Sequence, residues 1–327
     1  MSSRLSLALT SGAVSLPDSG DILLLRPPAD LVLEGLPVER VTVLHGFRPD
    51  LESLEARGLR VVPSVDGTFA GAVVFVARAK ALTLDLLAEA FSRVGPGGQV
   101  VVDGAKADGI ESTLRILRQV TATGEVFSKA HGKCFTVTAP ATVPEGWAAE
   151  PVLVDGYQTT AGVFSADGID PGSALLAAHL GGLSGKVCDL GAGWGYLARA
   201  VLAAPKVTSL ALVEAEKTAL DCARANVTDP RASFHWADAT RWTGGPFDVV
   251  VSNPPFHVGR AADPGLGRAF VQAAARLLTP RGRLLMVANR HLPYEATLRD
   301  VFADTVVRAD QAGYKVIEAT RPKRRHP

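Results

Sequence analysis

The segment Ser252-Asn253-Pro254-Pro255-Phe256-His257 combines a carboxamide, two prolines and an aromatic ring. Both prolines fix φ and lack an N–H group, so the turn is stiff and its carbonyl oxygens are free to accept hydrogen bonds. The Asn253 side-chain oxygen and the Pro254 carbonyl can then accept from one planar NH₂ group, while Phe256 stacks on the ring that carries it. Because an amide is too weak a base to remove a proton first, Asn253, Pro254, Pro255 and Phe256 would assist a reaction at nitrogen by positioning and charge stabilisation. In isolation the segment also suits a rigid surface turn, but its place directly after an apolar stretch favours a catalytic site.

A glycine-rich loop lies upstream, in Asp189-Leu-Gly191-Ala-Gly193-Trp-Gly195-Tyr196. It follows an apolar stretch and precedes a helical one, which is where open α/β sheets bind ligands close to the backbone. The rival dinucleotide pattern G-x-G-x-x-G requires glycine at position 196, where this chain has tyrosine. The spacing G-x-G-x-G, with Asp189 two residues before it, is typical of enzymes that use S-adenosylmethionine (SAM).

Positions after the next two strands complete the expected cofactor site. Glu214 ends the second strand of this half, where its carboxylate can accept hydrogen bonds from both hydroxyls of a ribose. Asp238 and Ala239 follow the third strand, within reach of an adenine amino group. Either acid alone is also compatible with a solvated strand end. Together with the loop they predict a SAM site made of Asp189, Gly191, Gly193, Gly195, Glu214, Asp238, Ala239 and Asn253.

These residues need a scaffold, and the chain alternates short apolar stretches with amphipathic ones. Continuous Val- and Leu-rich strands separated by helices indicate parallel sheets that are covered on both faces. The fold class is therefore α/β. The expected strands are 41–44, 72–76, 99–102, 186–190, 210–213, 247–251 and 283–287, and the clearest helices are 82–94 and 267–278.

The two halves of the chain share one plan. Residues 72–106 and 247–290 each contain a strand, a helix, a turn with Pro and Gly and a buried strand, and each continues into an expected antiparallel hairpin. Strand-helix-strand units are common, so the matching turns and hairpins (125–137 and 305–318) carry the inference of a duplication. Only the second half has the glycine loop and Asn-Pro-Pro, so the first half is expected to be a degenerate copy. The Pro-containing linker 139–146 gives the expected domains 1–145 and 146–320, followed by a basic tail, 321–327.

Composition excludes several classes of protein. The 327 residues fit two domains, and 47% hydrophobic with 20% charged residues fits an ordinary globular core. A net charge of +1 excludes a polybasic or strongly acidic chain. The three widely spaced cysteines exclude a disulfide framework and a structural zinc, so we expect no metal and a reducing cytoplasm. The chain has no run of about 18 apolar residues that would span a membrane, and residues 5–16 are expected to form an amphipathic first helix instead of a signal peptide.

Charge is distributed unevenly along the chain. Residues 1–150 carry 14 basic and 17 acidic side chains, a net charge of −3, whereas residues 151–327 carry 20 and 16, a net charge of +4. The tail from Arg321 to Arg325 alone supplies four positive charges. This tail is either a solvated end or an arm that binds phosphates without reading sequence.

The second half resembles the catalytic domain of the bacterial ribosomal RNA guanine-N2 methyltransferases, most closely the small-subunit RsmC type. The resemblance implies two tandem Rossmann-like class I methyltransferase domains, of which the first supports folding and RNA engagement and binds no SAM. It also implies that Phe164, Ser165 and Asp170 lie near the cofactor or the entering base, although a helix entry capped by Ser173 fits that segment equally well. The matching segments, in order within residues 155–318, are Gly162–Ser165, Asp167–Ser173, the glycine loop, Asn253–His257 and Val287–Tyr294.

The resemblance implies methyl transfer from SAM to the exocyclic N2 amino group of a guanine in 16S rRNA, with S-adenosylhomocysteine as the second product. The base must be splayed out onto Phe256, because N2 is normally used in pairing. Arg260 and Arg268 are expected phosphate contacts, and His257 is either a substrate contact or a loop residue with a structural hydrogen bond. The expected partner is the 30S subunit, and we expect a cytoplasmic monomer.

Three alternatives remain open from the sequence. Asn289-Arg290-His291 also resembles the large-subunit branch, which modifies 23S rRNA. A protein glutamine N5-methyltransferase presents a carboxamide NH₂ that fits the same clamp, but that family usually has tyrosine where this chain has Phe256. A ribosome-assembly factor without activity is disfavoured by the intact glycine loop, Glu214 and Asn253.

Overall fold

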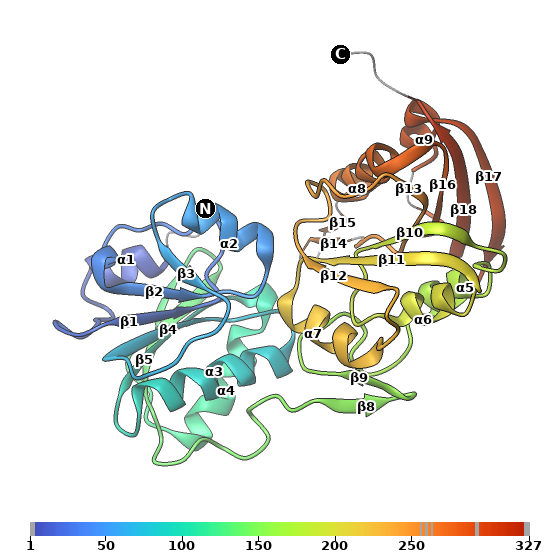
Figure 1. The fold of residues 1–327 in the computed structure, drawn as a ribbon. Coiled ribbons are helices and arrows are strands. Elements are labelled where there is room, and N and C mark those ends of the chain that lie inside the picture. The colour runs from blue at the N-terminus through green and yellow to red at the C-terminus, as the bar shows by residue number, and fades with distance from the viewer. Residues whose placement is uncertain (1–3, 256, 259–260, 263, 292–293, 324–327) are drawn as a thin grey trace. The chain divides into compact units, whose positions relative to one another are not determined.

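The structure is a computed structural model that describes residues 4–255, 257–258, 261–262, 264–291 and 294–323. The chain divides into two compact units, Met1–Glu150 and Pro151–Pro327, whereas the sequence placed the boundary after residue 145. Each unit is a sheet with helices packed on its faces (Figure 1). None of the helices within the described ranges combines the length and apolarity needed to cross a bilayer.

The first domain contains a seven-stranded sheet in the order β3-β2-β1-β4-β5-β7-β6. Strands β1 to β5 run parallel, and β7 pairs antiparallel with both β5 and β6. Its strands are β1 (Ile22–Leu25), β2 (Val41–Leu44), β3 (Arg60–Val62), β4 (Gly71–Phe75), β5 (Gln99–Ala105), β6 (Phe127–Lys129) and β7 (Gly132–Thr138). Its α-helices are α1 (Arg4–Thr10), α2 (Arg48–Glu55), α3 (Lys80–Val94) and α4 (Ile110–Val120).

The second domain repeats this topology, with the order β12-β11-β10-β13-β16-β18-β17. Its sheet strands are β10 (Ser184–Leu190), β11 (Lys206–Glu214), β12 (Ala232–Trp236), β13 (Phe247–Ser252), β16 (Leu278–Asn289), β17 (Phe302–Gln311) and β18 (Tyr314–Pro322). Two small hairpins are added, β8 (Val152–Val154) with β9 (Tyr157–Thr159), and β14 (His257–Val258) with β15 (Ala261–Ala262). The helices are α5 (Pro171–Ala177), α6 (Tyr196–Leu202), α7 (Lys217–Asn226), α8 (Pro264–Leu277) and α9 (Glu295–Val301). Because both sheets are parallel with an antiparallel end and share one strand order, the predicted tandem α/β fold is confirmed.

Alternate residues of the central strands in the second domain face two separate cores. Cys188 and Val250 belong to the core under α8 and α9, whereas Val187 and Val249 belong to the core under α5, α6 and α7. Burial on both faces is expected of a parallel sheet covered by helices. This packing fixes the carboxyl ends of β10, β11 and β13 relative to one another, and the expected site residues follow from these ends.

Three expectations from the sequence need correction. Strand β1 (Ile22–Leu25) was missed, although this apolar run is as long as the expected strand 41–44. The first helix ends at Thr10 instead of residue 16, just before Gly12 adopts a positive φ of 73°. The basic tail does not begin at residue 321, since β18 extends to Pro322 and Arg321 Nε donates to Asp304 Oδ2 at 2.8 Å.

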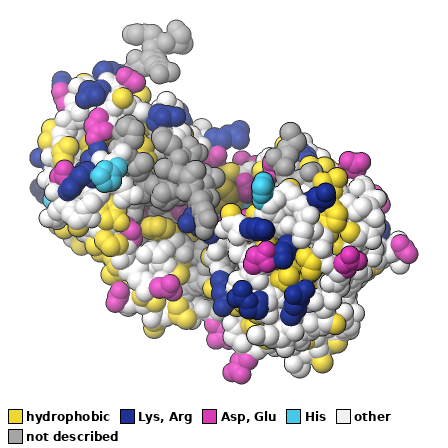
Figure 2. Space-filling view, turned by 180° about the vertical axis from the view of Figure 1, so that it is seen from behind, with side chains coloured by type: hydrophobic (Ala, Val, Ile, Leu, Met, Phe, Trp, Pro, Cys, Tyr) yellow, Lys and Arg dark blue, Asp and Glu magenta, His cyan; other side chains and the backbone are white. Residues whose placement is uncertain are grey.

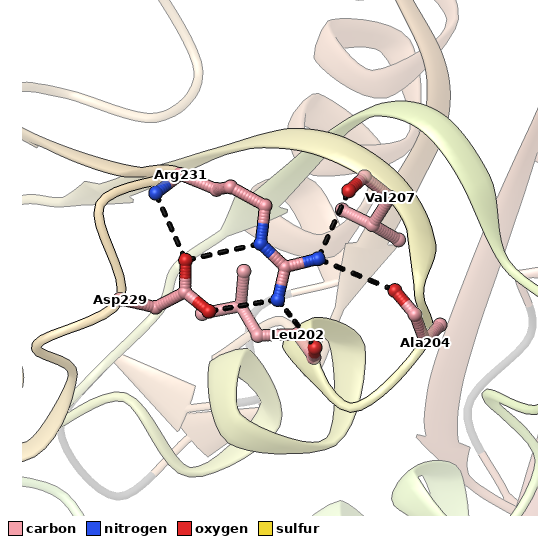
Figure 3. Close-up of polar contacts among 5 residues, drawn as sticks. All are labelled: Leu202, Ala204, Val207, Asp229 and Arg231. Atoms are coloured by element: carbon pink, nitrogen blue, oxygen red, sulfur yellow. Dashed lines mark hydrogen bonds and ion pairs between the residues drawn. The ribbon is translucent and has the colours of Figure 1, made fainter.

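Arg231 closes the edge of the second sheet where β11 and β12 begin (Figure 3). Its guanidinium donates to the carbonyls of Leu202 (2.6 Å) and Val207 (3.0 Å), and it pairs with both carboxylate oxygens of Asp229 at 2.7 and 3.0 Å. The last carbonyls of a helix have no hydrogen-bond donor within the helix, and Arg231 supplies a donor to the last carbonyl of α6. The hydrogen bonds from Arg231 lower the pKa of Asp229 to about 2.

Candidate active site

The glycine loop turns directly from β10 into α6. Gly191 N donates to Val213 O at 2.9 Å, which ties the start of the loop to the neighbouring strand. Gly193 has a φ of +55°, a region that L-residues seldom occupy, and a Cβ built there would meet no atom within 4 Å. The space that a side chain would fill at Gly193 is therefore open to a ligand.

Glu214, at the end of β11, faces this loop. Its Oε2 accepts from Gly193 N at 2.8 Å and its Oε1 accepts from Glu216 N at 2.8 Å. Burial raises the pKa of Glu214 above its usual range. Each carboxylate oxygen retains a free lone pair for a ligand hydroxyl, as the prediction for ribose requires.

Asp189 is buried directly before the loop and is fully inaccessible to solvent. Neither of its carboxylate oxygens has a hydrogen-bond partner among the described residues. Burial, followed by the charge of Glu214, raises the pKa of Asp189 to about 8. A buried carboxylate without partners is costly unless a ligand supplies a donor or a cation. Together with the open space at Gly193, it fits a cofactor such as SAM, which carries an ammonium group.

Asn253 follows β13 and is held on one side by the start of α5. Its Nδ2 donates to Asp170 Oδ2 at 2.9 Å and to Ser173 Oγ at 2.7 Å. Ser252 Oγ donates to Leu190 O at 2.6 Å, so the end of β13 is fixed to the end of β10. Pro254 is buried and Pro255 is exposed.

One pocket at the carboxyl ends of the strands is lined by the glycine loop, Asn253 and the segment that leads into α5. Six predicted residues line it, namely Phe164, Ser165, Asp170, Gly191, Gly193 and Asn253. The lining also includes five residues for which the sequence predicted no site role, namely Ser173, Ala192, Trp194, Tyr196 and Leu197. Ser173 lies 80 residues from Asn253 in the sequence, so no local pattern links them. Trp194 and Tyr196 lie within the glycine loop itself, so the sequence could have identified them as pocket residues from that position.

Phe164 is held at the mouth of this pocket by the loop. Its side chain is 63% exposed, and its carbonyl accepts from Trp194 Nε1 at 2.8 Å. Tyr157 and Tyr196 pack around the Trp194 ring, with centroid distances of 4.9 and 5.7 Å. Ser165 Oγ donates to Gly168 O instead of pointing to a partner across the pocket.

This pocket is not lined by the other predicted cofactor residues, Asp189, Gly195, Glu214, Asp238 and Ala239. Asp238 Oδ1 accepts from the N–H and hydroxyl groups of Thr240 at 2.8 and 2.7 Å, and Ala239 is buried in the core beside β12. Arg268 is exposed on α8. Phe256 and Arg260 lie outside the described residues, and His257 is described only as the first residue of β14. Over the described part of the chain, no group of three or more His, Cys, Asp or Glu residues is arranged to hold a metal ion.

The first domain keeps the backbone of this site with different side chains. The ends of β1 and β2 pair in the same register as the ends of β10 and β11, which places Arg26 where the second domain has Gly191. Arg26 N donates to Leu44 O at 2.9 Å, matching the bond from Gly191 N to Val213 O, and Arg26 retains a positive φ of 57°. The shared register therefore supports the inferred duplication of the domain.

Other equivalent positions have also lost the required groups. His45 takes the place of Glu214, and its Nδ1 accepts from the N–H of Phe47, two residues on, as Glu214 Oε1 does from Glu216. Phe75 takes the place of Asn253. Both line a cavity of about 480 Å³ that also contains the buried ion pair between Arg4 and Asp103. The first domain thus lacks the glycines, the carboxylate and the amide on which the SAM prediction rests.

The duplicated fold, the glycine loop, the acidic strand ends and Asn253 together define a class I methyltransferase. The model of the methyltransferase small domain family matches residues 156–318. Two curated relatives named ribosomal RNA small subunit methyltransferase C, from Shewanella oneidensis and Shewanella baltica, are each 33% identical over 256 and 262 residues. These matches cover 75% of this chain and 75% and 74% of the two relatives. The chain belongs to the ribosomal RNA small subunit methyltransferase C (RsmC) family.

A solved structure agrees with this assignment. The T. thermophilus 16S rRNA N2 methyltransferase RsmC, in complex with AdoMet and guanosine, matches with a TM-score of 0.77 and 25% sequence identity. The match covers 97% of this chain and 91% of that chain, so it includes both domains. The predicted family and fold are confirmed.

Proposed function

We propose that this enzyme transfers the methyl group of SAM to the exocyclic N2 amino group of a guanine in 16S rRNA. The observation that carries the proposal is one pocket in which Asn253, an acceptor for an NH₂ group, meets a glycine loop that fits SAM. The T. thermophilus relative acts on guanine 1207 of 16S rRNA and is bound to AdoMet and guanosine. A guanine-1207-type site on the 30S subunit is therefore the proposed target.

The cofactor would be held by the glycine loop and by the two carboxylates at the ends of β10 and β11. Glu214 would accept from the ribose hydroxyls, and Asp189 would pair with the ammonium group. Gly193 lets the ligand approach the backbone, because a side chain there would fill the space. When bound, SAM supplies an electrophilic methyl group.

The chain's own contribution to the reaction is to orient the nucleophile. Asn253 Oδ1 and the Pro254 carbonyl accept from the two hydrogens of the guanine amino group, which aligns its nitrogen for in-line attack. These acceptors also stabilise the positive charge that develops on the amino group during transfer. Because neither acceptor is basic enough to remove a proton, the proton leaves to water after transfer. Phe256, as predicted from the sequence, stacks on the guanine ring.

RNA contacts are proposed for both domains. Lys and Arg side chains gather on the visible face of the first domain, the right-hand body in Figure 2. Within that domain, a hydrogen bond from Lys133, with the charges of Lys106 and Arg115, lowers the pKa of Glu111. Cations gathered in this way suit RNA phosphates, which give affinity without reading sequence. The first domain is proposed to bind RNA and support folding, without binding SAM.

The basic chain end offers a test of phosphate contacts made by the second domain. Lys323 Nζ donates to Arg299 O at 2.7 Å and Arg321 pairs with Asp304, so both belong to the folded domain. Deleting residues 324–327 removes two arginines and leaves those contacts intact. We expect weaker RNA binding and a smaller dependence of log Kd on log salt concentration. An unchanged salt slope would show that the end is only a solvated terminus.

The deciding experiment supplies methyl-labelled SAM with unmodified 30S subunits, 50S subunits, naked rRNA or a protein extract. The labelled RNA is digested to nucleosides and identified by mass. N2-methylguanosine from 30S particles is the expected product. The same nucleoside from 50S particles would indicate the 23S branch, and label in protein would indicate the glutamine alternative. No label anywhere would favour an inactive assembly factor. A monomer acting in the cytoplasm completes the proposal.

A further inference from the structure

We infer that Asp170 and Ser173 are positioning residues that fix which end of the Asn253 carboxamide faces the substrate. This inference rests on the proposed function, because it concerns how the same site selects an amino group. The resemblance implied that Asp170 lies near the cofactor or the base. The structure instead places its carboxylate against Asn253, with Oδ2 2.9 Å from Nδ2.

The orientation follows from the hydrogen-bonding capacity of each group. An ionised carboxylate only accepts hydrogen bonds, whereas the two ends of a carboxamide differ: the NH₂ end donates and the oxygen accepts. Asp170 therefore attracts the NH₂ end of Asn253 and would repel its oxygen. Ser173 Oγ takes a second hydrogen bond from the same nitrogen at 2.7 Å. With Nδ2 occupied twice, Oδ1 is the end left to meet the substrate.

The two partners are themselves held rigidly. Asp170 is the N-cap of α5, and its Oδ2 also accepts from Ser173 N at 2.7 Å. Ser173 is buried, with 8% of its surface exposed. A Cβ at Gly172 would lie 2.9 Å from the Tyr314 ring and 3.1 Å from Asp170 Oδ2, so glycine lets this turn pack closely around the carboxylate.

The arrangement gives the site a preference for donors. If the carboxamide were reversed, the site would present an NH₂ group and would accept a carbonyl such as guanine O6. As oriented, it accepts from an exocyclic amino group and disfavours an oxygen at the same place. Asp170 and Ser173 thereby contribute to the choice of atom without touching the substrate.

An exchange of donor and acceptor tests this role. In Asn253→Asp, two carboxylates face each other at the distance now spanned by a hydrogen bond, so one must retain a proton. We expect the kcat of this variant to fall as the pH rises and the shared proton is lost. In Asp170→Asn/Asn253→Asp, an amide again faces a carboxylate, and the acceptor again faces the substrate. The double variant loses the hydrogen bond from Ser173 N, because that bond uses the same Asp170 oxygen. We expect the double variant to recover at least about 10-fold in kcat over Asn253→Asp at pH 8, without the fall at high pH.

Milder variants separate positioning from folding. Ser173→Ala keeps the backbone N–H that Asp170 accepts, and we expect about a 10-fold loss in kcat with the Kd for SAM changed less than about 3-fold. Asp167→Asn repeats the Asp-to-Asn change of the double variant at an exposed position on the same loop, and it should leave kcat unchanged. Thermal unfolding of every variant monitors the cap of α5.

The outcomes distinguish a failure of the proposed function from a failure of the positioning role. All variants are assayed on unmodified 30S subunits by release of N2-methylguanosine. If the wild-type enzyme makes no N2-methylguanosine, the proposed function fails. If it does, but the double variant has the same kcat and pH profile as Asn253→Asp, the positioning role is wrong. A parallel loss of SAM affinity and kcat in Ser173→Ala would also overturn it, since the pair would then support the cofactor pocket.

Discussion

Asp189 combines complete burial with two carboxylate oxygens that have no partner among the described residues, and its pKa is raised to about 8. In the unfolded chain a carboxyl of this kind ionises near pH 3.9. The folded protein therefore holds one proton more than the unfolded chain between about pH 4 and about pH 8. Stability from this group is accordingly lost as the pH rises through that window, and the loss is complete above the folded pKa.

Asp189→Asn removes this titration. The free energy of unfolding of the wild-type protein, measured relative to the variant, should fall by about 1.4 kcal/mol for each pH unit within the window. Between pH 5.5 and pH 7.5 the difference should therefore change by about 3 kcal/mol. Using the difference between the two proteins cancels the titrating groups that do not interact with Asp189, such as His45 in the first domain.

The assay is urea unfolding of both proteins at several pH values, followed by tryptophan fluorescence. Trp194, Trp236 and Trp242 lie in the second domain and Trp147 in the first, so the signal reports mainly on the domain that contains Asp189. Parallel stability curves for the two proteins would refute the reasoning, because they would show that Asp189 is ionised in the folded state.

Ligand binding supplies an independent check on Asp189. A cationic group beside it favours the ionised carboxylate, so SAM binding at pH 6.5 should release close to one proton. Calorimetry in two buffers with different ionisation enthalpies measures this number. Asp189→Asn should release no proton and should bind SAM more weakly.

Three further predictions concern the pocket and the fold. Asn253→Ala should lower kcat by about 10²-fold and leave the Kd for SAM nearly unchanged, as for loss of a transition-state hydrogen bond; an equal loss of SAM affinity in calorimetry would contradict the assignment. Gly193→Arg should abolish SAM binding, because its side chain enters the open space beside the loop and its backbone must adopt a positive φ; retained binding would place the cofactor elsewhere. Arg231→Ala should lower the unfolding temperature by a few degrees, since it removes the side-chain donor to the carbonyls of Leu202, at the end of α6, and Val207, in β11. Arg224→Ala removes an exposed pair with Asp221 and an exposed contact with the Phe234 ring. It is the matched control and should have little effect.

Much of the catalytic machinery could be predicted because its parts are local in the sequence. The spacing of Gly191, Gly193 and Gly195 depends on one tight turn between a strand and a helix, and such a turn imposes its own residue types. Asn253 and Pro254 are recognisable for the same reason, since the prolines and the amide act within one turn. Both segments follow strands of a parallel sheet, so their meeting at one edge follows from the fold class.

The boundaries of the helices and strands were harder to predict from the sequence than the catalytic residues. Strand β1 is short, and its burial on all four residues comes from neighbours on both sides of the sheet. The end of β18 depends on pairing with β17, where Phe302 lies opposite Pro322. Residue types near a chain end do not reveal whether a partner strand is present, which is why Arg321 was assigned to the tail.

The sequence by itself determined the class of chemistry, the cofactor type and the presence of a degenerate copy, because each depends on short segments whose residue types are dictated by local geometry. Only the tertiary structure decided that Asp170 and Ser173 hold the Asn253 amide, 83 and 80 residues away. It also decided that the carboxylate of Asp189 has no hydrogen-bond partner among the described residues, and that Arg26 stands where Gly191 would be. These are properties of distance, burial and register, and the packing of the whole sheet sets them.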